Sequence, residues 1–221
     1  MFIKKSKTKF TIIAVYVDDI KLIGTLKESP QTIEYLKEFE VKNLGKIKLC
    51  LNLELEYKAN RILVHRSAYT KRIFKSFNMD KAHPLTTPMV VRLFEPHKDL
   101  FCPKEPDEEI LDPEVPYLKE IRVLMYLAQC TNLDIAFTIN LLARFSSEPT
   151  RRHWNEIKHI FRHLHGTIDL RLFYSKKTTS SGLVRYTNVG YKSNSHKTRS
   201  QISYLFCYNS VNTHSSPRFN C

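Results

Sequence analysis

The first part of the chain alternates between strand-like and helix-like spacing of its apolar positions. An unbroken apolar run over residues 10–17 is followed by a second run over residues 20–23, and Gly24 ends that run. Two such runs separated by two polar residues predict a β-hairpin. The residues at the tip of this hairpin are Asp18 and Asp19.

The pattern beyond the hairpin predicts mixed secondary structure. Ser29 and Pro30 are typical first residues of a helix, and apolar positions follow them at helical spacing. Residues 47–57 alternate as in one long strand, residues 62–65 as in a short strand, and Ser67 can begin another helix. We therefore expect an α/β (α+β) fold.

Prolines mark a change of character at residues 81–116, where the sequence predicts a link without a core of its own. Helical spacing then returns at about residues 117–129, 133–146 and 150–165. Thr150 is a suitable N-cap for the last helix and Gly166 a suitable C′ residue. Strand-like runs follow at residues 170–174, 183–187 and 202–208, whereas residues 209–221 lack periodicity and are expected to be unstructured.

The distribution of charge along the chain indicates a class of partner. The chain of 221 residues carries a formal net charge of +13, and residues 151–221 hold 12 Lys and Arg against two acidic residues, a net of +10. Such a basic half favours a polyanion, most often nucleic acid, although a solvated basic surface explains the charge equally well. The basic residues of the helix at 150–165 that could contact phosphates are Arg151, Arg152, Lys158 and Arg162.

Several other classes of protein are disfavoured. The five cysteines show no C-x-x-C spacing and are expected to be reduced thiols of an intracellular protein, in the cytoplasm or nucleus and not secreted. No apolar run approaches the length of a membrane span, and five glycines leave no phosphate-binding loop. His159 and His163 have a spacing that can bind zinc, but without an evident third ligand we assign no metal there.

The candidate chemistry lies at Asp18 and Asp19. Two carboxylates on a rigid β-turn are what a pair of magnesium ions needs in nucleotidyl transfer. Asp is also common in ordinary turns. The preceding Tyr16 and Val17, with an apolar strand on each side, favour the catalytic interpretation.

A series of short motifs strengthens this interpretation, and their order resembles the reverse transcriptase region of copia-type retrotransposon polyproteins, especially the plant elements. The resemblance covers about residues 5–206. The matching motifs include Tyr16-Val17-Asp18-Asp19, Leu44-Gly45-Lys46, Phe77-Asn78-Met79, Val115-Pro116-Tyr117, Leu124-Met125-Tyr126-Leu127-Ala128, Asp134-Ile135-Ala136-Phe137, and His153-Trp154-Asn155.

The resemblance implies roles for these residues. Asp18 and Asp19 would be two of the three palm carboxylates that bind catalytic Mg²⁺, and Tyr16 and Val17 would line the floor near the primer terminus. The implied partners are an RNA or DNA template-primer and nucleotides, with no membrane and no other small-molecule cofactor. The implied organisation is a partial palm at 1–80, a proline-rich link at 81–116, a helical connection at 117–168, an incomplete ribonuclease H-like sheet at 169–208 and a tail at 209–221.

The chain departs from a working enzyme at both candidate centres. Residues 1–17 contain no Asp or Glu, so the third carboxylate and the fingers are missing, and we expect no nucleotidyl transfer by this chain alone. Asn188 stands where the ribonuclease H pattern has an acidic ligand, so RNA cleavage is not expected either. The alternative function is a non-catalytic nucleic-acid-binding module that uses the basic C-terminal half.

Overall fold

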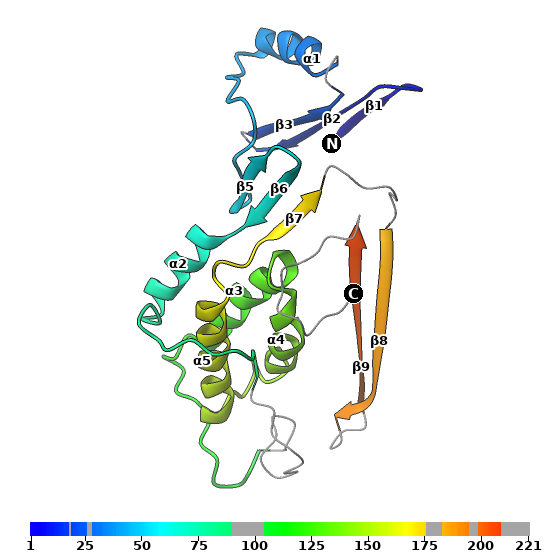
Figure 1. The fold of residues 1–221 in the computed structure, drawn as a ribbon. Coiled ribbons are helices and arrows are strands. Elements are labelled where there is room, and N and C mark those ends of the chain that lie inside the picture. The colour runs from blue at the N-terminus through cyan, green and yellow to red at the C-terminus, as the bar shows by residue number, and fades with distance from the viewer. Residues whose placement is uncertain (18, 26–27, 90–103, 176–182, 195–198, 209–221) are drawn as a thin grey trace. The chain divides into compact units, whose positions relative to one another are not determined.

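The computed structural model describes residues 1–17, 19–25, 28–89, 104–175, 183–194 and 199–208. The chain divides into two compact units, Met1–Cys50 and Leu51–Cys221. Both contain helices and antiparallel strands (Figure 1), so the predicted α+β class is confirmed.

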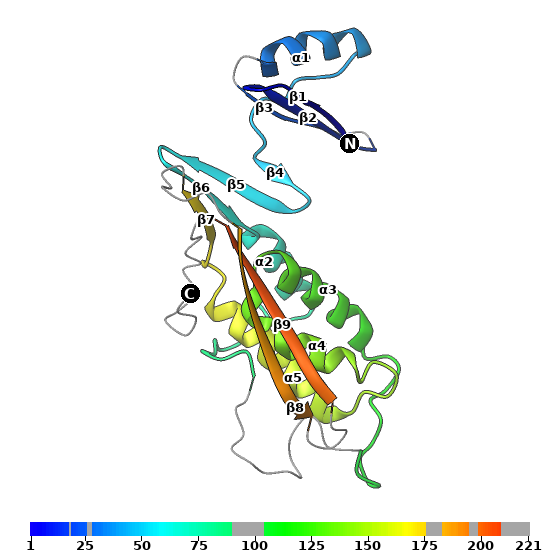
Figure 2. The same ribbon diagram turned by 90° about the vertical axis from the view of Figure 1, so that its right-hand side faces the viewer.

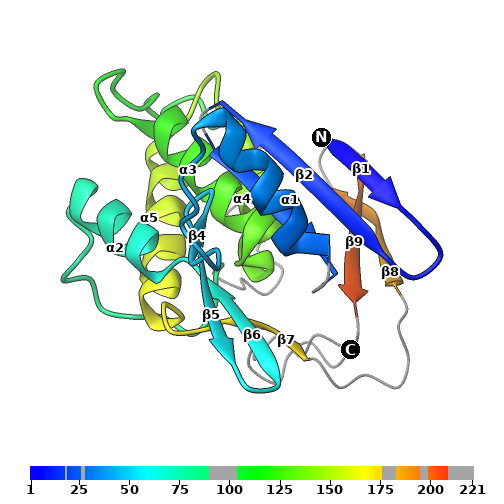
Figure 3. The ribbon, with the colours of Figure 1, turned by 90° about the horizontal axis from the view of Figure 1, so that it is seen from above.

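The first unit is a small antiparallel sheet with one helix. Its strands β1 (Phe2–Lys5), β2 (Phe10–Tyr16) and β3 (Asp19–Gly24) pair in the order β1-β2-β3, which confirms that residues 10–24 form a hairpin. The prediction that Asp19 lies at its tip is wrong, because Asp19 is the first residue of β3 and pairs with Tyr16. Helix α1 (Glu28–Leu36) continues as a 3₁₀ turn, Lys37–Phe39, and lies across this sheet (Figure 3). A Cβ atom on Gly24 would lie 3.0 Å from the carbonyl oxygen of Phe10, so the glycine permits the close approach of the chain there. The unit ends with the short strand β4 (Leu49–Cys50).

The long strand predicted for residues 47–57 is wrong at Leu51 and Asn52. Both residues have left-handed backbone conformations, with φ of 49° and 57°, so β5 forms only over Leu53–Lys58. Asn52 is one of the residue types that adopt this conformation at least cost.

The second unit contains a sheet and a separate hairpin. Strand β6 (Arg61–His65) pairs with β5 on one side and with β7 (Leu172–Ser175) on the other, which brings segments more than a hundred residues apart in sequence into register. Strands β8 (Leu183–Asn194) and β9 (Arg199–Tyr208) pair with each other.

The helices of the second unit are α2 (Ser67–Ser76), α3 (Tyr117–Cys130), α4 (Ala136–Ala143) and α5 (Arg151–Gly166), with a 3₁₀ turn η2 at Leu133–Ile135 (Figure 2). The predictions for α3 and α5 are confirmed to within one residue at each end. The helix predicted at 133–146 is shorter, since it begins as the η2 turn and ends at Ala143. Thr150 caps α5 as predicted: its backbone N–H donates to Nδ1 of His153 at 3.0 Å.

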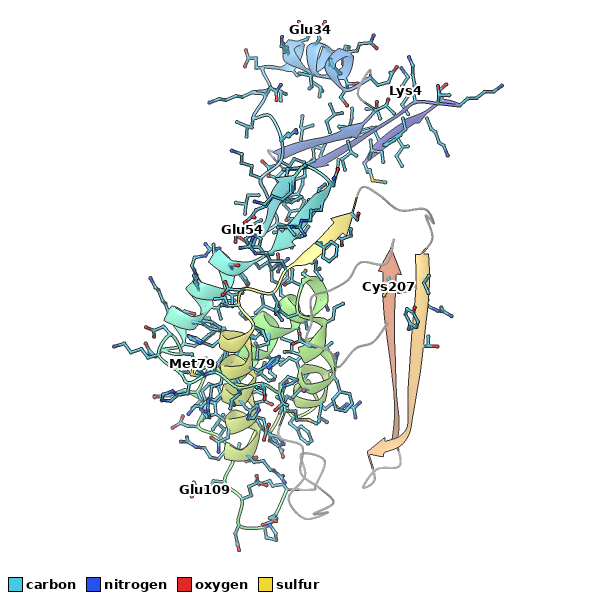
Figure 4. All side chains as sticks on the ribbon, viewed as in Figure 1. Lys4, Glu34, Glu54, Met79, Glu109 and Cys207 are labelled. Atoms are coloured by element: carbon cyan, nitrogen blue, oxygen red, sulfur yellow. The ribbon has the colours of Figure 1, made fainter. Side chains whose placement is uncertain are left out.

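One hydrophobic core unites these helices. The aromatic rings of Phe74 on α2 and Phe161 on α5 lie 6.4 Å apart in an edge-to-face arrangement, and Phe77 lies 5.4 Å from Phe161. Met79, labelled in Figure 4, packs against this core from the turn after α2. The fully buried members of the core include Leu124, Leu127, Ile135, Ile139, Leu141, Leu142, Ile157 and Ile160.

The first part of the proline-rich segment is held against α5. Nε of Arg162 donates to the carbonyl oxygen of His83 at 2.9 Å, and Nε2 of His159 lies 2.9 Å from that of Thr87. Gly166 belongs to this contact, because a Cβ atom there would lie 3.1 Å from the carbonyl oxygen of Leu85. Its predicted role as a C′ residue is wrong: α5 includes Gly166, and Thr167 follows as the C-cap.

Candidate functional site

The turn between β2 and β3 has two residues. In the sheet register, Thr11 is opposite Gly24 at one end of the hairpin and Tyr16 is opposite Asp19 at the other, which leaves Val17 and Asp18 between the strands. Val17 has φ of 49° and is 81% exposed. Two-residue hairpins need a positive φ at their first central residue, and a β-branched residue held there costs about 1–3 kcal/mol. The backbone is therefore strained at the residue just before the paired carboxylates.

Of the two aspartates at this turn, Asp19 belongs to the described residues. Asp19 is the first residue of β3, and its side chain is exposed. Lys21 lies two residues further along the strand, on the same face of the sheet, because side chains alternate along a strand. Asp18 lies outside the described residues. Tyr16, opposite Asp19 in the sheet register, is exposed as well.

The chemistry of this turn suits magnesium, but the number of ligands does not. Carboxylate oxygens are the ligands that Mg²⁺ prefers. Asp19 is, however, the one acidic residue in strands β1, β2 and β3. Across the described ranges, no three His, Cys, Asp or Glu side chains come close enough together to hold a metal ion. The described residues therefore do not complete a metal site around Asp19.

The basic residues predicted to contact phosphates lie along α5, and three of them contact other groups of the protein. Nη2 of Arg152 forms an ion pair with Oε2 of Glu108 at 3.0 Å. Arg162 donates to His83, as described above, and Nζ of Lys158 lies 5.6 Å from the centre of the Trp154 ring. Arg151 is exposed at the start of the helix.

Asn188, the degenerate ribonuclease H position, lies in β8. Its backbone is opposite Ser203 of β9.

A polar network around His65 was not found from the sequence. The His65 ring is buried. Its Nε2 lies 3.1 Å from Oε1 of Glu56, and its Nδ1 lies 3.0 Å from Oγ of Ser67. The carboxylate of Glu54, labelled in Figure 4, accepts a hydrogen bond from the backbone N–H of Ala68 and so caps α2. Burial opposes ionisation of Glu56, but Arg171 at 2.8 Å and His65 together hold the pKa of this carboxyl below its usual value. These partners come from separate elements, so no local pattern indicates the network.

Arg66 was also missed. Its side chain is 3% exposed, and its guanidinium carbon lies 3.9 Å from the centre of the Tyr126 ring. Nη2 donates to the carbonyl oxygen of Leu51 at 3.4 Å, while Nε and Nη1 have no hydrogen-bond partner among the described residues. The pairing of a buried guanidinium with an aromatic face contributes about 2 kcal/mol when desolvated, which offsets part of the cost of burying the charge.

Comparison with known proteins shows what the chain is similar to. Residues 1–91 match the family described as reverse transcriptase (RNA-dependent DNA polymerase). The retrovirus-related Pol polyprotein from transposon TNT 1-94 of Nicotiana tabacum is 29% identical over 212 residues, which cover 94% of this chain. The chain is related to copia-type retrotransposon Pol polyproteins.

Other relatives agree with this relationship and show how much of a polyprotein the chain covers. The Pol polyprotein from transposon RE1 of Arabidopsis thaliana is 29% identical over 82% of this chain. The chain spans 16% of the TNT 1-94 polyprotein and 12% of the RE1 polyprotein. By contrast, an uncharacterized mitochondrial protein of Arabidopsis thaliana, AtMg00810, is 24% identical over 74% of this chain, and the match covers 65% of that protein.

No solved structure matches the chain. Within the described part of the chain, none of the helices has the length and apolar character needed to cross a membrane.

Proposed function

We propose that the chain contains the C-terminal half of a reverse transcriptase palm and does not extend a primer by itself. Asp18 and Asp19 would supply two carboxylate ligands for Mg²⁺, with Tyr16 and Val17 beside the primer terminus. The observation that carries this proposal is the two-residue β2–β3 turn with its strained Val17, since backbone strain gathers at functional sites. The family match of residues 1–91 supports the same assignment.

Inactivity follows from the number of ligands. Two-metal nucleotidyl transfer requires that both ions be held at fixed positions by several carboxylates. Strands β1, β2 and β3 contribute Asp19 alone, and residues 1–17 contain no acidic residue. A pair of adjacent carboxylates without a third would bind magnesium weakly and leave its position unfixed.

The remaining domain assignments are part of the same proposal. Helices α3, α4 and α5 would form the connection at 117–168, and β8 with β9 would belong to a ribonuclease H-like segment at 169–208. The antiparallel pairing of these two strands is compatible with that assignment. Asn188 would make this segment unable to cleave RNA, because an amide cannot replace an anionic magnesium ligand.

A primer-extension assay with an RNA template tests the proposal. The intact chain and its Asp18→Asn and Asp19→Asn variants would be assayed with Mg²⁺ and with Mn²⁺, and Asp107→Asn, at an exposed position outside the turn, serves as the matched control. An active reverse transcriptase on the same template verifies that the template-primer is competent. We expect no incorporation by any form of this chain. Templated incorporation that Asp18→Asn abolishes and Asp107→Asn leaves intact would refute the proposal.

A second candidate is a nucleic-acid-binding module without catalysis. It was first suggested by the basic C-terminal half of the sequence. The contacts of Arg152, Arg162 and Lys158 within the fold make α5 a weaker choice for such a surface.

A further inference from the structure

A segment with neither helix nor strand, residues 80–88, runs along α5, and we call it the strap. Three α5 side chains hold the strap through its backbone carbonyl groups. Nε of Arg162 donates to the carbonyl oxygen of His83 at 2.9 Å. The imidazoles of His159 and His165 contact two further carbonyl groups, near opposite ends of the strap, at 2.9 Å and 3.2 Å. The side-chain contacts between the strap and α5 are thus polar.

The backbone of the strap also comes close to the helix. The N–H of Leu85 donates to the carbonyl oxygen of Arg162 at 3.1 Å. A Cβ atom on Gly166 would lie 3.2 Å from Cβ of Pro84, so the missing side chain leaves room for the strap. The contacts of Arg162 and His165 are exposed, and water competes for the same groups, so each contributes little to holding the strap. The strap therefore needs apolar contacts to stay in place.

Two methionines provide these apolar contacts, one at each end of the strap. Met79, labelled in Figure 4, directly precedes the strap, and Met89 directly follows it; both side chains pack against the hydrophobic core of the second unit. Ala82 and Leu85, the aliphatic residues between them, are not members of that core. The backbone at Met79 is fixed as well, since its N–H donates to the carbonyl oxygen of Phe74 at 2.8 Å. The apolar link between the strap and the core thus depends on two thioether side chains.

Thioethers differ from other apolar groups in that a mild oxidant changes their polarity. Met79 and Met89 are half-buried, so a molecule as small as hydrogen peroxide can reach them. Peroxide transfers one oxygen atom to the sulfur: an S–O bond forms, the O–O bond breaks, the sulfur loses two electrons, and water is released. The resulting sulfoxide is polar, and burying it without a hydrogen-bond partner is unfavourable. Oxidation therefore opposes the packing of both side chains against the core.

We propose that Met79 and Met89 form a redox-sensitive clasp, and that their oxidation by peroxide releases the strap from α5. Release exposes residues 81–85 to proteases and separates the side chains of His159 and Arg162 from their backbone partners. The change is reversible, because methionine sulfoxide reductases restore the thioether. The clasp is independent of the proposed palm, since no residue of the β2–β3 turn takes part in it.

Proteolysis of the folded, intact chain measures release of the strap. Lys81 is exposed within the strap, and trypsin cuts after it at a rate that follows the population in which the strap is open. Cleavage after Lys58, next to the exposed turn between β5 and β6, is the internal reference. After treatment with hydrogen peroxide, we expect cleavage after Lys81 to accelerate by at least about tenfold relative to cleavage after Lys58. Mass spectrometry of the peptides records the sulfoxide at each methionine.

Leucine substitutions separate the clasp from other effects of peroxide. Met79→Leu/Met89→Leu keeps apolar side chains of similar volume and removes both thioethers, so cleavage after Lys81 should stay slow before and after peroxide. Met125→Leu is the matched control, because Met125 is also half-buried and packs against the same core, but from α3. This control should remain as sensitive to peroxide as the unchanged chain. All forms contain the same five cysteines, so cysteine oxidation cannot cause a difference between them.

Three outcomes would overturn the proposal. The first is sulfoxide at both Met79 and Met89 without faster cleavage after Lys81. The second is the same acceleration by peroxide in Met79→Leu/Met89→Leu as in the unchanged chain, and the third is resistance of Met79 and Met89 to peroxide while Met1, which is 79% exposed, is fully oxidised. Slow cleavage that returns after treatment with methionine sulfoxide reductases would support the clasp. Circular dichroism verifies that each variant is folded before trypsin is added.

Discussion

Glu120 provides the sharpest test of the energetics of this fold. Its carboxyl is on α3 between the core residues Tyr117 and Leu124, and burial raises its pKa from 4.5 to about 7, despite the nearby charges of Lys158 and Lys119. The folded state therefore holds a proton that the unfolded chain releases at lower pH. The stability contributed by this proton is fully present below about pH 4.5 and is lost as the pH rises through 7.

The magnitude follows from the same shift. A change of one pKa unit corresponds to 1.36 kcal/mol, so an ionised Glu120 costs about 3 kcal/mol of folding free energy above pH 7. Glu120→Gln replaces the carboxyl by a neutral amide of the same size. The variant should therefore gain between about 2 and 3 kcal/mol relative to the unchanged chain at pH 8, and less than about 1 kcal/mol at pH 5.

Urea unfolding at the two pH values measures this difference. Trp154, the single tryptophan, packs against the core from α5 and reports on unfolding by its fluorescence. Glu109→Gln, at an exposed position, is the matched control and should change stability by less than about 0.5 kcal/mol at both pH values. A stability difference for Glu120→Gln that is the same at pH 5 and pH 8 would refute the reasoning.

Three further substitutions test other contacts. Val17→Asn should stabilise the first unit by about 1 kcal/mol in urea unfolding followed by circular dichroism, because asparagine tolerates the left-handed conformation and little buried area is lost. Asp134→Asn weakens the 2.6 Å contact between its Oδ2 and Nε2 of buried His163, and should lower the free energy of unfolding by about 1–3 kcal/mol; an unchanged urea midpoint would contradict this. His153 has a pKa lowered to about 4 by burial, so stability should fall as the pH drops from 6.5 towards 4. His153→Gln, which keeps a side-chain acceptor for the helix cap, should lose this acid dependence when unfolding is compared at pH 7 and pH 4.5.

Much of the secondary structure could be predicted from the sequence because local signals determine it. Thr150 marks the start of α5 by capping, and two apolar runs around a pair of aspartates identify the β2–β3 hairpin. The break at Leu51 and Asn52 was missed, since alternation of side chains continues through the turn and only the backbone angles reveal it.

The tertiary contacts could not be predicted in the same way. His163 meets Asp134 from another element, and the histidines at 159 and 165 bind backbone carbonyl groups of the segment before α3. The sequence distributes basic residues over the whole C-terminal half, and it does not say which of them are neutralised. The fold decides this: it pairs Arg152 with Glu108 and leaves Arg151 exposed.

The continuous core of the second unit has a consequence for how copies of such genes can be shortened. The reverse transcriptase match ends at residue 91, yet Ile73 and Phe74 on α2 are buried against side chains from α3 and α5. A shortened gene that stopped at the family boundary would leave these two side chains in water and deprive α2 of its packing. Truncated copies that still produce a folded protein should therefore retain sequence through at least the end of α5. The end of the reverse transcriptase match and the boundary set by folding are therefore different places in this chain.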